Sequence, residues 1–377
     1  MPNLQDVALE AGVSISTVSR VLNGATLCDR VSGDVSERVR AAARRLGYVG
    51  GYHRRAIRSG KTETLGVVID QTGPAPEPNH PSALLQPFYG EVIAGVEQAT
   101  HAAGYNLALI VPSRQERANL RGRKQLEEKR IDGLVLPPCN RSPENTQTLR
   151  ESPLLPIVSV LPPVETRLPC FFYDMEDAIT QLIGHLHGLG HRELLYIGPE
   201  VGRESNVTAE QRQQYFFAAA CRLGIKGDSF LHERPPRDPH NPTDPLVEAR
   251  YREEAVQRWL KRRESEGTGR GVTGIVCFND VTAVSVCRVL ARHGIRVPQD
   301  MSVTGFDSLP PDHMQTSLTS IDARLVDLGI RAGRLVVELA EGGEKAVAAH
   351  RGFREVIQAR LVVRESTGPA PSDRPNA

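Results

Sequence analysis

Residues 6–24 read DVALEAGVSISTVSRVLNG, and this stretch decides the fold of the amino-terminal segment. Apolar residues recur at helical spacing up to Gly12, which breaks the first helix, and Ser14 can cap a second helix. A third helical pattern begins near Ser32 and stops at Gly47. Three short helices, the first two joined by a tight turn, predict a small bundle that contains a helix-turn-helix.

The charged residues are divided unevenly between this segment and the remainder of the chain. Residues 1–61 contain ten Lys or Arg and five Asp or Glu, whereas the remainder contains 36 and 40. A basic helix-turn-helix segment predicts binding to the phosphates of double-stranded DNA. Its second helix would lie in the major groove, where Ile15, Ser16 and Thr17 meet base edges or phosphates and Arg20 supplies charge or a guanine contact.

Beyond residue 63, short apolar runs alternate with amphipathic helical stretches. The runs include LGVVI, NLALIV, DGLVL, ELLYIGP, GIVCFND and MSVTGFD. This alternation predicts parallel sheets with crossover helices, and the number of units favours two α/β lobes with a ligand-binding cleft between them. The proline-rich segments 71–87 and 233–245 are expected to be loops.

Several classes of protein are excluded by what the sequence lacks. No apolar run approaches the roughly 20 residues of a membrane-spanning helix, and the amino terminus has no secretion signal, so we expect a cytoplasmic protein. The six cysteines contain no C-x-x-C pair, which favours reduced thiols over disulfides. No phosphate-loop, dinucleotide-binding, zinc-protease or nucleophile-elbow motif occurs, so we expect no catalysis, no cofactor and no metal site.

The amino-terminal stretch closely resembles the lactose-repressor (LacI/GalR) family of bacterial transcription regulators. It matches each specified position of their pattern D-V-A-x-x-A-G-V-S-x-x-T-V-S-R-x-L-N, and the resemblance continues to about residue 364. The resemblance implies an N-terminal all-α helix-turn-helix DNA-binding headpiece followed by a two-lobed α/β effector domain similar to periplasmic binding proteins. The expected boundaries are a headpiece at 1–48, a hinge or linker at 49–63, an effector domain at 64–364 with lobe crossovers near residues 190, 322 and 350, and a disordered tail at 365–377.

The resemblance also implies a function: a homodimeric transcription repressor on a pseudo-palindromic operator, controlled by a sugar or sugar derivative. Ile15 and Ser16 would set the operator preference. The residues expected to place the second helix on the DNA backbone are Thr17, Ser19, Arg20 and Asn23. In the hinge, Gly50 and Gly51 replace the family's Pro-Asn, and Ile57, flanked by Arg54 and Arg55, would wedge into the minor groove. The alternative interpretation is that residues 49–63 form only a basic tether.

The effector-site residues follow from the same resemblance. Asp280, after the strand GIVCFN, would accept hydroxyl groups of the ligand, and Arg212 would grip a ligand oxygen or carboxylate. Phe88 and Tyr89 would pack on the ligand. Further candidates are Asp174, Asn279 and Asp307. For each of these residues, the alternative is a structural cap or core position.

The sequence is compatible with both induction and corepression. Two other classes of protein remain as alternatives. A small-molecule-binding protein without DNA regulation would leave the basic headpiece idle, and an α/β enzyme would convert the ligand bound in its cleft.

Overall fold

The structure is a computed structural model that forms two compact units, Met1–Glu63 and Thr64–Ala377. It describes residues 2–22, 31–48, 60–69, 87–111, 118–137, 143–151, 153–162, 164–200, 207–232, 245–267, 269, 271–309 and 317–371. The hinge residues Arg54, Arg55 and Ile57, the helix-end residue Asn23, and most of the predicted loops 71–87 and 233–245 lie outside these ranges.

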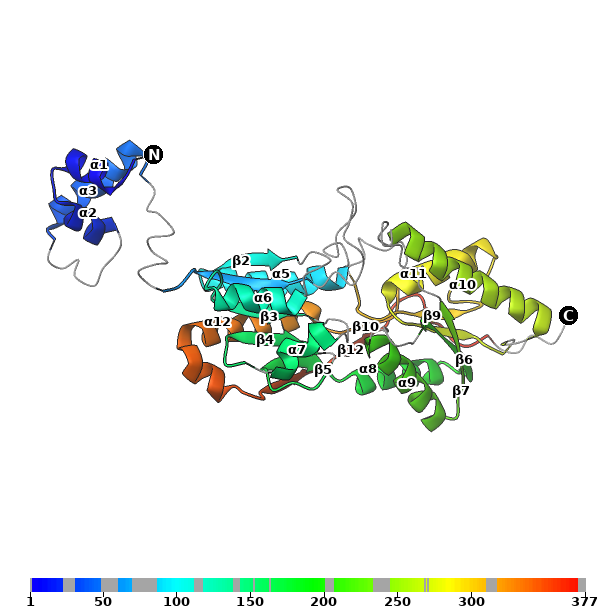
Figure 1. Ribbon diagram of the computed structural model, residues 1–377. Helices are drawn as coiled ribbons and strands as arrows, with labels where there is room; N and C mark the ends of the chain where they lie inside the picture. Colours follow the sequence, from blue (N-terminus) through cyan, green and yellow to red (C-terminus); the bar gives the residue numbers. More distant parts are fainter. Residues whose placement is uncertain are drawn as a thin grey trace. The chain divides into compact units, whose positions relative to one another are not determined.

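The first unit is a bundle of three helices, drawn in blue in Figure 1. They are α1 (Leu4–Ala11), α2 (Ile15–Leu22) and α3 (Gly33–Leu46). Helix α1 begins at Asn3, whose side chain accepts hydrogen bonds from two backbone amides, and it ends at Gly12 in the left-handed conformation, φ 65°. Arg38 of α3 donates to the carbonyl of Ala11 over 2.7 Å, so the third helix is tied to the turn between the first two. The bundle buries Val7, Ala8, Ala11, Val18, Val21, Val39, Ala42 and Ala43.

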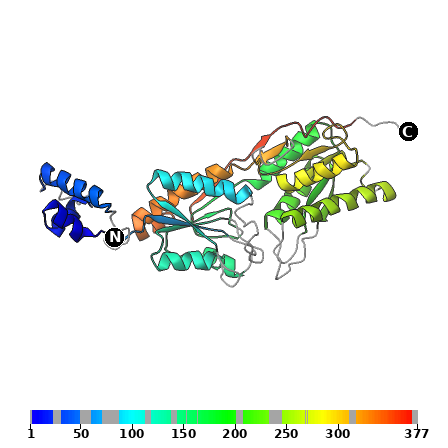
Figure 2. The ribbon, with the colours of Figure 1, turned by 90° about the horizontal axis from the view of Figure 1, so that it is seen from above.

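The second unit contains a six-stranded parallel sheet in the order β11-β5-β4-β3-β1-β2. Helices α5 (Pro87–Ala102) and α12 (Leu325–Ala349) cover one face, and α6 (Ala118–Glu127) and α7 (Pro143–Glu151) cover the other (Figure 2). Successive strand residues face opposite sides, so both faces are apolar. The strands are β1 (Thr64–Val68), β2 (Asn106–Ile110), β3 (Gly133–Leu136), β4 (Ile157–Val160), β5 (Cys170–Tyr173) and β11 (Arg354–Ile357).

A second parallel sheet has four strands in the order β7-β6-β8-β9. One face packs on α8 (Met175–Gly188) and α9 (Val207–Arg222), and the other on α10 (Pro245–Glu266) and α11 (Asp280–Arg292). The strands are β6 (Glu193–Pro199), β7 (Lys226–His232), β8 (Gly274–Cys277) and β9 (Ser302–Thr304). The two sheets confirm the predicted pair of α/β lobes.

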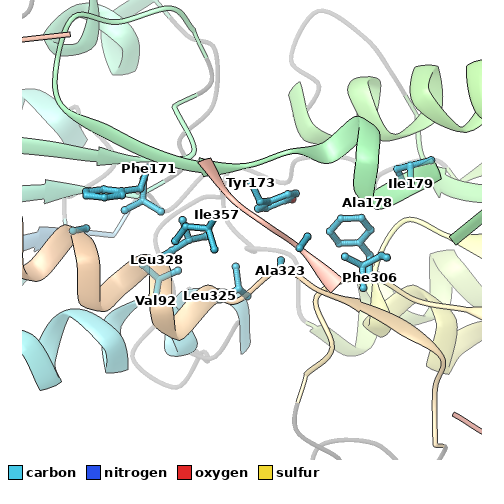
Figure 3. Packing of buried hydrophobic residues seen from close by; sticks show 14 of the residues in the cluster. Val92, Phe171, Tyr173, Ala178, Ile179, Phe306, Ala323, Leu325, Leu328 and Ile357 are labelled. Carbon is cyan, nitrogen blue, oxygen red and sulfur yellow. The ribbon is translucent and has the colours of Figure 1, made fainter. Parts of the chain in front are cut away.

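The chain passes between the two sheets three times, after β5, after β10 (Ser320–Asp322) and after β11. Strand β10 pairs antiparallel with β12 (Arg360–Val362) beside these crossovers. The sequence predicted crossovers near residues 190, 322 and 350. In the structure the first crossover precedes α8, because α8 packs on α9 of the second lobe, and the third follows β11, because β11 pairs with β5 of the first lobe. Figure 3 shows buried side chains along the crossovers, including Tyr173 and Phe306, which belong to one continuous apolar cluster.

The segment 365–371 is folded against the second lobe, so the predicted disordered tail is wrong for these residues. Ser366 is 2% exposed, and its hydroxyl donates to the carbonyl of Val303 over 2.6 Å and accepts from the amide of Thr319. The amide of Val303 donates to the carbonyl of Ser366. This polar segment therefore covers β9, the edge strand of the four-stranded sheet. Residues 372–377 lie outside the described part of the chain.

His191 lies beside this segment and is held by it. His191 is fully buried, and its ring nitrogens contact Thr273, Ser302 and the carbonyl of Gly368.

Across the residues that the structure describes, no group of three His, Cys, Asp or Glu side chains could hold a metal ion. Among the same residues, no helix has both the length and the apolar character needed to span a membrane.

Candidate functional site

Helix α2 has one buried face and one exposed face. Val18 and Val21 pack into the small core of the bundle, whereas Ile15 is 47% exposed and Ser16 and Arg20 are exposed. Because Ser16 and Arg20 lie four residues apart, they occupy the same face of the helix. Thr17 and Ser19 are half-buried beside that face. The helix therefore offers an apolar, a hydroxyl and a cationic group together.

Ser14 organises the start of α2. Its hydroxyl oxygen accepts a hydrogen bond from the amide of Thr17 over 3.2 Å, which confirms the predicted cap. The same oxygen lies 2.8 Å from the hydroxyl of Ser16 and 2.9 Å from that of Thr17. These contacts orient the first turn of the helix, where Ser16 is exposed.

In the second unit, Arg212 is the centre of a buried polar cluster. Its guanidinium donates to the hydroxyl of Tyr173 over 3.1 Å, to Asp307 over 3.0 Å and to the carbonyl of Phe278. The guanidinium also lies over the ring of Phe306, 3.6 Å from the ring centroid. Tyr173 ends β5 of the six-stranded sheet, whereas Phe278 and Asp307 follow β8 and β9. The cluster therefore joins the carboxyl ends of strands from both sheets, where α/β proteins bind ligands.

The cluster contains one pair of opposite charges, Arg212 and Asp307, and one buried hydrogen-bond donor without a partner. Burial raises the pKa of Asp307 from its ordinary value, although the neighbouring Arg212 opposes this shift. Burial opposes the charge of Arg212, but Tyr173 and Asp307 outweigh burial and raise its pKa. The Nε of Arg212 is buried and has no hydrogen-bond partner within the described residues. A polar ligand atom or a water molecule could accept this hydrogen bond.

Asp280 is the first residue of α11 and lies at the carboxyl end of β8, as the sequence predicts. Its carboxylate is fully buried, and both oxygens already accept hydrogen bonds, from the hydroxyl of Ser320 over 2.6 Å and from the amide of Leu309 over 2.8 Å. Burial, with a contribution from Asp307, raises the pKa of Asp280 to about 7. Asp307 is thus the carboxylate that contacts Arg212, whereas the carboxylate oxygens of Asp280 contact Ser320 and Leu309.

The other candidate residues occupy separate positions. Asn279 and Asp174 are the caps of α11 and α8, and each side chain accepts a backbone hydrogen bond from the first turn of its helix. Phe88 and Tyr89 lie in the first turn of α5 with their ring centroids 5.6 Å apart and edge to face. The half-buried Phe88 packs on the same apolar cluster that contains Tyr173 and Phe306.

Sequence reasoning did not identify Tyr173 or Ser320. In CFFYD, Tyr173 is indistinguishable from the other apolar residues of a buried strand, and Ser320 is one small polar residue among several in SLTSI. The aromatic ring that ends a strand directly before an acidic cap could have identified Tyr173, because such a residue lies at the edge of the sheet where ligands bind.

Comparisons with protein families match both units. Residues 3–50 match the model described as bacterial regulatory proteins, lacI family, and residues 183–367 match the periplasmic binding protein-like domain. The chain is 27% identical to the HTH-type transcriptional regulator RegA of Clostridium saccharobutylicum, with 97% of this chain and 99% of the relative covered. It is also 27% identical to the transcriptional regulator GalR of Escherichia coli, over 90% of both chains.

Solved structures show the same fold. The lac repressor dimer bound to operator and the anti-inducer ONPF matches with a TM-score of 0.74 and 22% identity, covering 97% of this chain and 99% of that one. The complex of the transcriptional regulator CelR with cellobiose matches with a TM-score of 0.61 and 24% identity, covering 97% and 100%. The relatives named here are transcription regulators, not enzymes, which agrees with the missing catalytic motifs.

Proposed function

This chain belongs to the lacI family of bacterial regulatory proteins, and on that premise we propose that it is a transcription repressor controlled by a sugar or sugar derivative. It is a DNA-binding transcription regulator with a ligand-binding domain.

The exposed face of α2 supports the proposed reading of operator DNA. Ile15 can contact a thymine methyl group, Ser16 can hydrogen-bond a base edge, and Arg20 can bind phosphate or guanine. Thr17 and Ser19 would place the helix on the backbone together with Asn23. A homodimer would read a pseudo-palindromic operator, because two copies of one helix meet two equivalent half-sites. The solved lac repressor is a dimer on its operator. Arg54, Arg55 and Ile57 remain the proposed hinge contacts in the minor groove.

The buried pair of Arg212 and Asp307 is the observation that supports an uncharged effector. A sugar hydroxyl both donates and accepts, so it can accept from Arg212 and donate to Asp307 at the same time. A carboxylate or phosphate would meet the charge of Asp307 as well as that of Arg212. The CelR structure contains cellobiose, an uncharged sugar. Phe88 and Tyr89 would supply aromatic surface, and Asp174, Asn279 and Asp280 would complete the surroundings of the effector between the lobes.

Binding to DNA tests this function directly. We would measure the affinity of the full-length protein for fragments flanking its own coding region over a salt series, with and without glucose, galactose, ribose, lactose and cellobiose. The expected result is selective binding of one fragment that one sugar weakens or strengthens, with a slope against salt that reports phosphate contacts. Weak binding that is equal for all fragments would contradict DNA regulation and favour a small-molecule-binding protein.

A further inference from the structure

The hydrogen-bond acceptors of Arg212 come from both lobes. Asp307 and the carbonyl of Phe278 belong to the second lobe, as does Arg212 itself, whereas Tyr173 ends β5 in the first lobe. The hydroxyl of Tyr173 and the carboxylate of Asp307 accept from the same nitrogen, Nη2 of Arg212, over 3.1 Å and 3.0 Å. Of these hydrogen bonds, the one to Tyr173 is therefore the one that crosses between the lobes.

Buried groups of the protein surround Nη2 of Arg212. Arg212 is 2% exposed, Tyr173 is 4% exposed and Asp307 is 8% exposed. The guanidinium lies over the ring of Phe306, and that ring lies 5.8 Å from the ring of Tyr173 (Figure 3). An effector atom that binds to Nη2 must therefore replace one of its two acceptors, Tyr173 or Asp307.

Tyr173 is the acceptor that an effector replaces more easily. Asp307 is the counter-ion of Arg212, and separating the two would leave both buried charges uncompensated. Burial raises the pKa of Tyr173, so its hydroxyl stays protonated and neutral. A sugar hydroxyl has the same capacity to donate and accept, so it can accept from Nη2 in place of Tyr173 and donate to Asp307 on the same nitrogen.

Building on the proposed effector site, we propose that the hydroxyl of Tyr173 competes with a hydroxyl group of the effector for Nη2 of Arg212. The bond between Tyr173 and Arg212 holds the two lobes together at this point, and the effector binds when this bond is given up. The apparent affinity for the effector is then reduced by the fraction of protein in which Arg212 is bound to Tyr173. Tyr173 thereby determines the affinity for effectors that bind through a hydroxyl group.

Removal of this hydroxyl should strengthen effector binding. In Tyr173→Phe the ring remains next to Phe306, and Arg212 keeps its counter-ion Asp307. Sugar affinity should rise about fivefold or more, because the protein no longer has to break its own hydrogen bond before the sugar binds. A tyrosine that bound the sugar directly through its hydroxyl would give the opposite result, a loss of affinity. A purely structural role would change the Tm without raising the affinity.

The experiment uses the full-length protein in three forms: wild type, Tyr173→Phe and Tyr196→Phe. Tyr196 is a matched control, since it is a buried tyrosine on β6 whose hydroxyl has no hydrogen-bond partner within the described residues. Both changes remove one buried hydroxyl and keep the ring, and thermal unfolding checks that both variants fold.

Two measurements are made on each form. Calorimetric titration with glucose, galactose, ribose, lactose and cellobiose gives the sugar affinity. Hydrogen exchange without sugar is followed in peptides covering the crossovers at 172–178 and 320–326, where separation of the lobes exposes the backbone.

A higher sugar affinity in Tyr173→Phe, with Tyr196→Phe within about twofold of the wild type, would support the competition. An equal or lower affinity in Tyr173→Phe would overturn it, and so would an equal gain in both variants. If none of the five sugars binds to any form, the proposed effector class fails, and hydrogen exchange decides. Faster exchange at both crossovers in Tyr173→Phe alone then supports Tyr173 as the contact that an effector must break, and equal exchange in all forms overturns it.

Discussion

Nη2 of Arg212 lies 3.0 Å from Oδ1 of Asp307, and the two side chains are only 3% and 6% exposed. Two opposite charges taken out of water depend on each other, because removing one leaves the other buried without compensation. The pair is also stacked against Phe306 and connected to Tyr173, so it links the two sheets at the candidate effector site. Its loss should therefore change both stability and ligand binding.

We predict that Asp307→Asn lowers the free energy of unfolding by about 3 kcal/mol, since Arg212 keeps its charge but loses its counter-ion. Calorimetry or urea unfolding of the full-length protein measures this. The control is Glu254→Gln, which breaks the exposed pair of Glu254 and Arg250 and should cost less than about 1 kcal/mol. Equal losses of unfolding free energy in the two variants would show that the buried pair stabilises the fold no more than the exposed pair does.

The carboxyl group of Asp280 predicts a dependence of stability on pH. Burial and Asp307 raise its folded pKa to about 7, whereas the hydrogen bonds from Ser320 and Leu309 and the charge of Arg364 oppose the shift. The folded state therefore holds this proton between about pH 4 and pH 7 while the unfolded state releases it, and the stability from this group is lost as pH rises.

Relative to Asp280→Asn, the wild-type free energy of unfolding should fall by up to about 1.4 kcal/mol per pH unit between about pH 4 and pH 7, and level off above. Unfolding curves of both proteins at several pH values measure the difference. A difference that rises with pH would show that the folded-state pKa is lowered instead.

The exposed face of α2 predicts two distinct DNA-binding defects. Arg20→Ala should weaken all DNA fragments similarly and reduce the slope of log K against log salt by about 1 if Arg20 contacts a phosphate. Ser16→Ala should instead change which operator sequence is preferred, because a base-edge contact carries sequence information. Selection from a randomised operator library separates the two, and an unchanged preference in Ser16→Ala would refute its role in reading bases.

Helices α5 and α12 pack so closely that glycine is required at their contact. A Cβ at Gly95 would lie 2.0 Å from the carbonyl oxygen of Val326, and backbone cannot move aside as a side chain can. Gly95→Ala should therefore destabilise the second unit by about 1–3 kcal/mol, despite the higher helix propensity of alanine. Gly90→Ala on the same helix is the matched control, since no atom lies within 4 Å of its Cβ position. Thermal unfolding of the two variants should differ in this direction.

The carboxyl-terminal segment predicts a difference between two truncations. The protein that lacks only residues 372–377 is the reference for the Tm. Removing residues 365–377 should lower it, since Ser366, Thr367 and Gly368 make hydrogen bonds that cover β9 and reach His191. Ser366→Ala alone should cost about 1–3 kcal/mol, because it leaves the buried carbonyl of Val303 and the amide of Thr319 without this hydroxyl. Equal Tm values for the two truncations would contradict a structural role of the segment.

The sequence by itself determined the elements of this protein and their order. Local interactions between residues a few positions apart produce the turn at Gly12, the cap at Ser14 and the buried positions Val18 and Val21. Such interactions can be recognised from the sequence pattern. The alternation of apolar runs and amphipathic stretches beyond residue 63 predicts the strands and helices of the second unit for the same reason. The headpiece residues that we propose to read DNA follow from this local pattern together with the family resemblance.

Only the tertiary structure decided which polar residues meet. Arg212 lies 95 positions from Asp307 and 39 from Tyr173, and Asp280 lies 40 from Ser320. The crossovers between the two sheets bring these residues together, and local periodicity carries no information about them. For that reason the sequence did not reveal the contact between Asp280 and Ser320, and it wrongly predicted a disordered tail for the segment 365–371. The hydrogen-bond partners of Asp280 and of this segment come from distant strands, and both are buried among those partners.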